Sequence, residues 1–175
     1  MVRTSVYIAI SMDGFIARED GGIDWLALVE RPGEDHGYAG FFAQIDALVM
    51  GRKTYDTASG FPSWPYAGKR VVVLTHRAIA SREGVETFAG DPRELLAKLE
   101  RQGVKRAYVD GGDVIRQLIA ADLVDDLILS VIPILLGAGI RLFGNEEKHW
   151  TLESSRAFPS GLVQLGYLRS DMNQG

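Results

Sequence analysis

Cysteine is missing from the 175-residue sequence, and histidine occurs only three times. The absence of thiols excludes a disulfide framework, a thiolate nucleophile and a cysteine-based zinc site. His36, His76 and His149 lie far apart without the spacing of metal ligands, so no metal site is expected. Positive charge is not in excess either, because the formal net charge is −4. This balance argues against a general nucleic-acid binder, which neutralises many phosphates with lysine and arginine.

Long hydrophobic runs are also absent. No segment approaches the roughly 18 apolar residues of a membrane span. Residues 1–4 lead directly into a strand pattern, without the apolar core and cleavage site of a signal peptide. A cytoplasmic protein with no membrane partner is therefore expected. The length suits one domain, residues 1–175, that buries about two thirds of its unfolded surface.

The stretch from Ala107 to Gly137 has the pattern of a strand, a helix and a second strand. A short apolar run ends at Gly111 and Gly112, helical periodicity follows, and a second apolar run over 127–136 closes the unit. The glycines stand where strand becomes helix, so the backbone there can approach a ligand and the first helical N–H groups can bind an anion. A tight turn without a ligand is an equally open interpretation of this pair alone.

Similar patterns predict the other elements. Apolar runs rich in β-branched residues predict strands at 4–10, 15–17, 47–50, 70–74 and 85–88. Apolar residues at helical spacing predict helices at 37–45, 52–58 and 91–102. The last of these helices begins with Asp91 as N-cap and Pro92 in the first position. Two final strands, 150–156 and 162–168, flank a hairpin-like turn, so an α/β sheet is expected that is parallel at its centre and antiparallel at its end.

Ligand-type residues follow three of the predicted strands, at Gly51–Thr54, Thr75–Arg77 and Asp110–Asp113. In open α/β sheets, small molecules bind at the carboxyl ends of the strands. Arg52 and Lys53 oppose the helix dipole in the first turn of their helix, which favours a bound anion over chance exposure. Together the clusters favour a ligand with several phosphates, and NADP is the natural candidate.

Six motifs occur in order along the chain: SxDGxIA at 11–17, DWL at 24–26, MGRKTY at 50–55, LTHR at 74–77, DGG at 110–112 and PxLLGxGxxLF at 133–143. With them the sequence resembles the dihydrofolate reductase superfamily. It resembles more closely the stand-alone relatives of the reductase domain of the bifunctional riboflavin-biosynthesis deaminase-reductase. The resemblance implies a three-layer α/β fold with a mixed, mostly parallel central sheet, an antiparallel C-terminal edge and helices on both faces. It also implies an NADPH-dependent reductase acting on a heterocyclic C=N or ribosylamino-pyrimidine substrate.

The resemblance further implies a set of cofactor contacts. The NADP phosphates would be bound by Gly51, Arg52, Lys53 and Thr54. The adenosine 2′-phosphate would be held by Thr75, His76 and Arg77 together with Arg52, and Leu74 is a further cofactor contact. The pyrophosphate would be approached by Gly111, Gly112 and Asp113, and the nicotinamide would be flanked by Ala9 and Ile16. The carboxylate of Asp113 is expected to cap its helix and to point away from the phosphates.

A carboxyl group is expected to supply the proton for a reduced nitrogen. Asp35 falls where dihydrofolate reductases keep the acidic residue that grips the pterin, and with Asp24 and Trp25 it is assigned to the substrate. Its alternative role is that of a helix-terminus residue. Asp13, beside the implied nicotinamide site, is the second catalytic candidate, with a turn residue before Gly14 as its alternative.

Two other functions stay open at this point. The chain can be a dihydrofolate reductase proper, or a non-catalytic module that binds NADP. The strand and loop from Leu127 to Phe143 carry more hydrophobic surface than one sheet layer needs, and relatives in the family commonly pair at this end of the sheet. A homodimer is therefore expected.

Overall fold

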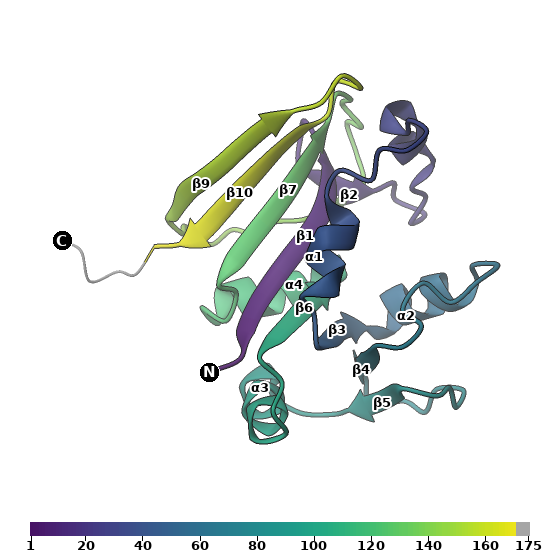
Figure 1. The fold of residues 1–175 in the computed structure, drawn as a ribbon, viewed down its shortest axis with the longest axis vertical. Coiled ribbons are helices and arrows are strands. Elements are labelled where there is room, and N and C mark those ends of the chain that lie inside the picture. Colours follow the sequence, from purple (N-terminus) through teal and green to yellow (C-terminus); the bar gives the residue numbers. More distant parts are fainter. Residues whose placement is uncertain (171–175) are drawn as a thin grey trace.

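One eight-stranded sheet organises the computed structural model, which describes residues 1–170 (Figure 1). The strand order is β5-β4-β3-β6-β1-β7-β10-β9. The strands are β1 (Arg3–Ser11), β3 (Ala47–Gly51), β4 (Arg70–Leu74), β5 (Val85–Phe88), β6 (Arg106–Asp110), β7 (Asp126–Ile132), β9 (Trp150–Ala157) and β10 (Val163–Arg169). Neighbours from β5 to β7 pair in parallel, whereas β10 is antiparallel to both β7 and β9. The predicted sheet, with its antiparallel C-terminal edge, is confirmed.

Helices cover both faces of this sheet. The helices are α1 (Tyr38–Ala43), α2 (Arg52–Ser59), α3 (Pro92–Arg101) and α4 (Gly112–Ala120). Side chains alternate along each strand, so one face of β6 presents Val109 to the cluster that contains Leu99 and Ile115. The other face presents Tyr108 to the cluster that contains Phe41. The expected three-layer arrangement is present, with α3 and α4 on one side and α1 and α2 on the other.

The unit formed by β6, α4 and β7 is the one predicted from residues 107–137. Both strands pair in parallel with β1, and α4 makes the crossover that parallel strands require. The helix buries Val114, Ile115, Leu118 and Ile119 against the sheet. β7 ends at Ile132 and not at 136 as predicted, because the next residue, Pro133, has no N–H group to continue the ladder.

Three further short elements complete the fold. The strand predicted at 15–17 is present as β2 (Phe15–Ala17), which pairs with β8 (Ile140–Arg141) in a separate two-stranded antiparallel sheet. The pairing, the two-residue β8 and the 3-10 helix η1 (Asp24–Val29), which buries Trp25 and Val29, were not predicted. Within residues 1–170, no helix has the length and apolarity needed to cross a membrane.

Candidate active site

Three neighbouring strands bring the ligand-type residues to one edge of the sheet. β4, β3 and β6 lie side by side, with Gly51 in register with Leu74 and Met50 in register with Asp110. Because the strands are parallel, the segments that follow them all leave from the same edge. The structure therefore places the predicted clusters at 51–54, 75–77 and 110–113 next to one another.

The starts of α2 and α4 touch at Gly111. This glycine is the residue before α4 and has φ 91°, in the region that favours glycine. A Cβ atom added there would collide with the side chain of Thr54, in the first turn of α2. No side chain caps either helix start, so their first N–H groups stay available to an anion.

Gly112 is equally crowded. A Cβ atom on it would lie 2.6 Å from Cδ1 of Ile16 and 3.0 Å from Nη1 of Arg116. The implied nicotinamide contact Ile16 therefore lies directly beside the start of α4. Ala9, the other implied contact, is in β1 opposite Ser130 and packs against a different cluster, around Trp25 and Phe158.

The carboxylate of Asp113 does not cap α4, contrary to expectation. The capping position belongs to Gly111, and Asp113 lies in the first helical turn, where it forms an ion pair with Arg116 one turn further on. Arg116 also donates to the backbone oxygen of Arg141 in β8. The negative charge of Asp113 is thus offset by the guanidinium of Arg116, a pairing that the sequence interpretation missed.

The basic residues of the clusters at 51–54 and 75–77 differ in how far neighbouring groups already engage them. The Nε of Arg52 donates to both carboxylate oxygens of Asp56 at 2.8 and 2.9 Å, and its Nη1 donates to the backbone oxygen of Ala78 at 3.0 Å. Arg52 therefore ties α2 to the segment that follows β4. In that segment Oγ1 of Thr75 accepts the N–H of Arg77 at 3.1 Å. The side chains of Lys53, His76 and Arg77 are exposed and available to a ligand.

Asp13 has its carboxylate engaged by neighbouring donors. Oδ1 accepts from the Ser11 hydroxyl at 2.6 Å and from the N–H of Leu136 at 3.1 Å, and Oδ2 accepts from the N–H of Gly137 at 2.7 Å. These bonds, that from Ser11 above all, lower the pKa of Asp13 to about 2. Asp13 is therefore ionised at neutral pH and ties its turn to the segment after β7. Its catalytic role stays a prediction, and this geometry favours the turn alternative.

Asp35 has a similar arrangement at the start of α1. Its Oδ2 accepts from the N–H of Ala39 and its Oδ1 from the N–H of Gly37, both at 2.9 Å. The bonds from Ala39 and Gly37 lower the pKa of this exposed carboxyl group. The helix-terminus role is thus supported by geometry, whereas the catalytic and substrate-binding roles of Asp35 stay predictions.

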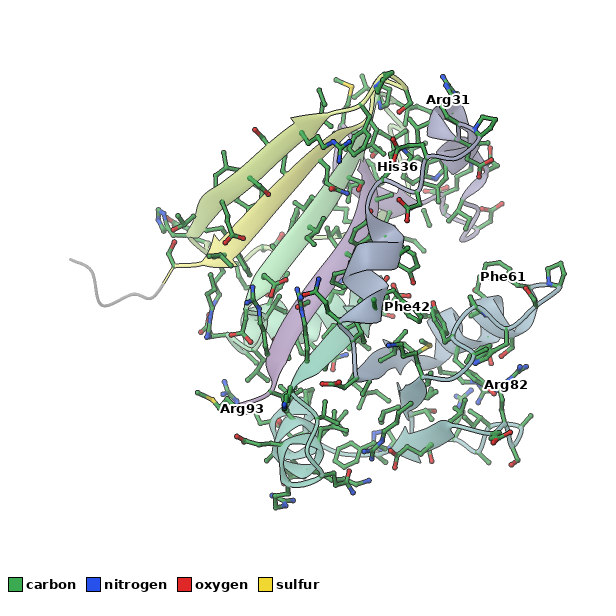
Figure 2. All side chains as sticks on the ribbon, in the orientation of Figure 1. Arg31, His36, Phe42, Phe61, Arg82 and Arg93 are labelled. Atoms are coloured by element: carbon green, nitrogen blue, oxygen red, sulfur yellow. The ribbon has the colours of Figure 1, made fainter. Side chains whose placement is uncertain are left out.

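The other two residues assigned to substrate lie on η1. Asp24 is exposed and paired with Arg18 at 2.7 Å, and this hydrogen-bonded pair lowers the pKa of Asp24. Trp25 is 2 % exposed, and its Nε1 is buried without a hydrogen-bond partner in residues 1–170. The Nε2 atom of His36, on the segment that enters α1 (Figure 2), is also buried without a hydrogen-bond partner in residues 1–170. The imidazole ring of His36 packs edge to face against the ring of Phe158. Buried nitrogens of this kind are rare without a ligand or water to satisfy them.

Asp110 is a further acidic residue at this edge of the sheet, and the sequence interpretation gave it no catalytic role. It ends β6 on the face shared with Tyr108, and its Oδ2 accepts from the hydroxyl of Tyr66 at 3.1 Å. Its Oδ1 accepts from the N–H of Gly111 at 2.8 Å, and within residues 1–170 no cation pairs with it. Burial raises the pKa of Asp110 above the ordinary value. Among the carboxyl groups at this end of the sheet, Asp110 keeps its proton to a higher pH than Asp13 and Asp35, whose pKa values are lowered.

Tyrosines surround Asp110 on the α1 face. Burial, followed by the nearby charge of Asp110, raises the pKa of Tyr38 to about 12 and that of Tyr66 even further. Further along the same face, the hydroxyl of Tyr7 donates to the backbone oxygen of His36 at 2.8 Å and accepts from Nε2 of Gln164 at 3.0 Å. This side of the sheet therefore carries neutral hydroxyl groups and aromatic rings beside one acid with a raised pKa.

Comparison with known proteins agrees with this architecture. The model of the RibD C-terminal domain family matches residues 66–164, and the chain belongs to that family. The chain is 35% identical to the uncharacterized protein YwjB of Bacillus subtilis, over 96% of this chain and 98% of that one. A solved protein of Shewanella sp. PV-4, named for riboflavin biosynthesis, is 34% identical, with a TM-score of 0.90 over 97% of this chain and 99% of that one.

The dihydrofolate reductase-like fold is confirmed by a more distant structure. Dihydrofolate reductase from Enterococcus faecalis, solved as a complex with NADP(H), superposes with a TM-score of 0.67 and 19% identity, covering 97% of both chains. At this identity the likeness concerns the fold alone. Membership of the RibD C-terminal domain family, together with this fold, places the chain among riboflavin-pathway reductase-like proteins.

Proposed function

We propose that the protein is an NADPH-dependent reductase that transfers a hydride to a heterocyclic C=N or ribosylamino-pyrimidine substrate. The observation that carries the proposal is the meeting of two uncapped helix starts at Thr54 and Gly111. Two such starts present converging N–H groups and the positive ends of two helix dipoles. A pyrophosphate is the ligand group that this arrangement fits, and a dinucleotide supplies it.

The choice of NADPH over NADH rests on the cations around the end of β4. Arg77 and His76 are exposed, and Arg52 is held against the backbone just after them. A guanidinium can grip a phosphate monoester with two parallel hydrogen bonds, and only NADPH carries such a group, on its adenosine ribose. We expect Arg77 to make the main contact, because Arg52 is already engaged by Asp56.

The substrate would lie on the α1 face, against Asp110 and its tyrosines. Bound NADPH would supply the hydride, and the protein would hold the acceptor in place, exclude water and deliver a proton to the nitrogen. Burial raises the pKa of Asp110 and so favours the protonated form that a proton donor needs, and the Tyr66 hydroxyl would donate a hydrogen bond to its carboxylate after the transfer. Asp13 and Asp35 have lowered pKa values, which favour their ionised forms, so they are weaker proton donors.

Purified protein tests the proposal directly. NADPH consumption should be observed with 5-amino-6-(5-phosphoribosylamino)uracil or a related ribosylamino-pyrimidine. Turnover of dihydrofolate with sub-micromolar inhibition by methotrexate would indicate a dihydrofolate reductase instead. Tight NADPH binding without turnover of any pyrimidine, pterin or carbonyl compound would indicate a non-catalytic NADP-binding module.

A further inference from the structure

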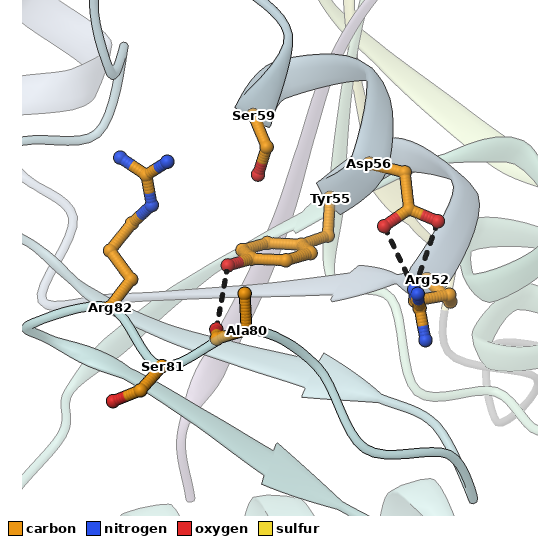
Figure 3. A pocket seen from close by; sticks show the side chains of 7 residues that line it. All are labelled: Arg52, Tyr55, Asp56, Ser59, Ala80, Ser81 and Arg82. Atoms are coloured by element: carbon orange, nitrogen blue, oxygen red, sulfur yellow. Dashed lines mark hydrogen bonds and ion pairs between the residues drawn. The ribbon is translucent and has the colours of Figure 1, made fainter.

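A cavity of about 480 Å³ lies between α2 and the segment 80–82 (Figure 3). Its lining residues are Arg52, Tyr55, Asp56, Ser59, Ala80, Ser81 and Arg82. Of the residues predicted to contact the cofactor, only Arg52 takes part. The volume falls within the range of small-molecule sites. The cavity is therefore large enough for a ligand and largely separate from the candidate active site.

The hydroxyl of Ser59 points into this cavity, as Figure 3 shows. Its oxygen is buried, yet none of the residues 1–170 forms a hydrogen bond with it. Thr57, two residues earlier on α2, behaves differently, because its hydroxyl donates to the backbone oxygen of Lys53 at 3.0 Å. A buried hydroxyl without a hydrogen-bond partner destabilises the folded state. A ligand atom that bonds to Ser59 would offset this destabilisation.

Arg82 supplies a positive charge to the lining of the cavity. Its guanidinium carbon lies 4.4 Å from the centroid of the Trp64 ring, and within residues 1–170 it has neither an ion pair nor a hydrogen bond through its side chain. Contact with an aromatic ring occupies the face of a guanidinium and leaves its N–H edge free. That edge matches the oxygens of a phosphate or a carboxylate.

The remaining lining completes an anion site with an aromatic floor. The carboxylate of Asp56 would repel an anion, but both of its oxygens accept from Nε of Arg52, which offsets its charge. The ring of Tyr55 forms the floor, and its hydroxyl already donates to the backbone oxygen of Ala80 at 3.3 Å. Arg82 therefore remains the uncompensated charge of the lining.

We propose that this cavity binds a free organic anion, made of a flat ring and a phosphate or carboxylate group, at a site separate from that of NADPH. The anionic group bonds to Arg82 and Ser59, and the ring lies against Tyr55. The proposal does not depend on the reductase function, because only Arg52 belongs to both sites.

Calorimetric titration of the full chain with phenyl phosphate tests this proposal. Wild-type protein should bind one equivalent. Arg82→Gln should raise the Kd about tenfold or more, and Ser59→Ala about threefold or more, since each removes one bond to the anion. Arg101→Gln, which changes an exposed arginine of α3, is the matched control and should leave the Kd unchanged. No binding by wild-type protein, or equal binding by Arg82→Gln, overturns the proposal.

Competition experiments separate the possible sources of the anion. Saturating NADPH should leave the Kd for phenyl phosphate unchanged within about twofold, whereas complete displacement would assign the cavity to the cofactor and overturn the proposal. Inorganic phosphate should bind about tenfold more weakly or worse, and equal affinity would refute the role of the ring. If NADPH does not bind at all, the reductase proposal fails, and the phenyl phosphate titration still decides the cavity.

Discussion

The side chain of Thr54 occupies the space that a Cβ atom on Gly111 would need. One residue is in the first turn of α2 and the other directly precedes α4, and 57 positions of sequence, from 54 to 111, separate them. This contact brings two helix starts to one place at the carboxyl edge of a parallel sheet. The cofactor proposal rests on that relationship, because a pyrophosphate would bind to the N–H groups of both helix starts. At this place Gly111 and Gly112 leave little room for a side chain.

Gly111→Ala should weaken NADPH binding strongly. The added methyl group meets Thr54, and alanine is strained at φ 91°, so either the backbone or α2 must move. Gly103→Ala is the control, because Gly103 has φ 84° but nothing within 4 Å of the added atom. Both variants should lose about 1–2 kcal/mol of unfolding free energy through the backbone. Only Gly111→Ala should also raise the Kd for NADPH, by about tenfold; equal affinities in the two variants would refute the cradle.

Asp110→Asn should remove the alkaline limb of the pH–rate profile. A donor with a raised pKa loses its proton as pH rises, so wild-type turnover should fall through that pKa, and the variant should be about a hundredfold slower at pH values below it. Asparagine still offers an oxygen to the Tyr66 hydroxyl. Asp35→Asn is the control: it should lower stability slightly, because it weakens the bonds to the start of α1, and it should keep the limb. If the alkaline limb of the pH–rate profile disappears in Asp35→Asn and persists in Asp110→Asn, the proton donor is Asp35 and not Asp110.

The same substitution should change the pH dependence of stability. The pKa of Asp110 in the folded protein lies above the ordinary value of about 3.9 in the unfolded chain. The folded state therefore keeps a proton that the unfolded state has lost, and Asp110 makes stability fall as pH rises from the ordinary value to the raised one. Denaturant unfolding of Asp110→Asn should show a gain over wild type at pH 8 that disappears near pH 3. A constant difference across this range would contradict the buried-acid description.

We propose that the homodimer expected from the sequence forms through β9. The apolar residues of β7, on which the expectation rested, are mostly buried inside the sheet between β1 and β10. β9, in contrast, is an edge strand whose residues from Thr151 onward are all exposed, with Leu152 54 % exposed. A second copy could cover such an edge. Light scattering should give twice the chain mass for wild type and a lower mass for Leu152→Lys; a wild-type mass of one chain would refute the dimer.

Much of the fold was accessible from sequence because its signals are local. β4 and β5 were predicted with their observed ends, since apolar runs there are bounded by polar or glycine-rich turns. The start of α3 was also correct, because Asp91 accepts the N–H of Arg93 at 2.7 Å as its type and position predict. The convergence of three strand-end clusters followed from the rule for parallel sheets alone.

The substrate side was less accessible because its interactions are distant in sequence. Tyr66, the partner of Asp110, comes from an irregular connection 44 residues earlier, and no pattern predicts its position. Within residues 1–170 no cation pairs with Asp110, so no positive charge offsets the effect of burial on its pKa. This too can be recognised only from the three-dimensional structure. The pairing of Asp113 with Arg116 has the local i,i+3 spacing and was detectable, but the neighbouring glycines suggested a cap instead.

The most direct test of the account is a fluorescence titration of the wild-type protein and of Arg77→Ala with NADPH and NADH. We predict that wild type binds NADPH at least about tenfold more tightly than NADH, and that Arg77→Ala removes this preference while leaving NADH affinity unchanged, because only NADPH offers a 2′-phosphate to the guanidinium. Equal affinities of the wild-type protein for the two cofactors, or no binding of either, would contradict the proposed NADPH site.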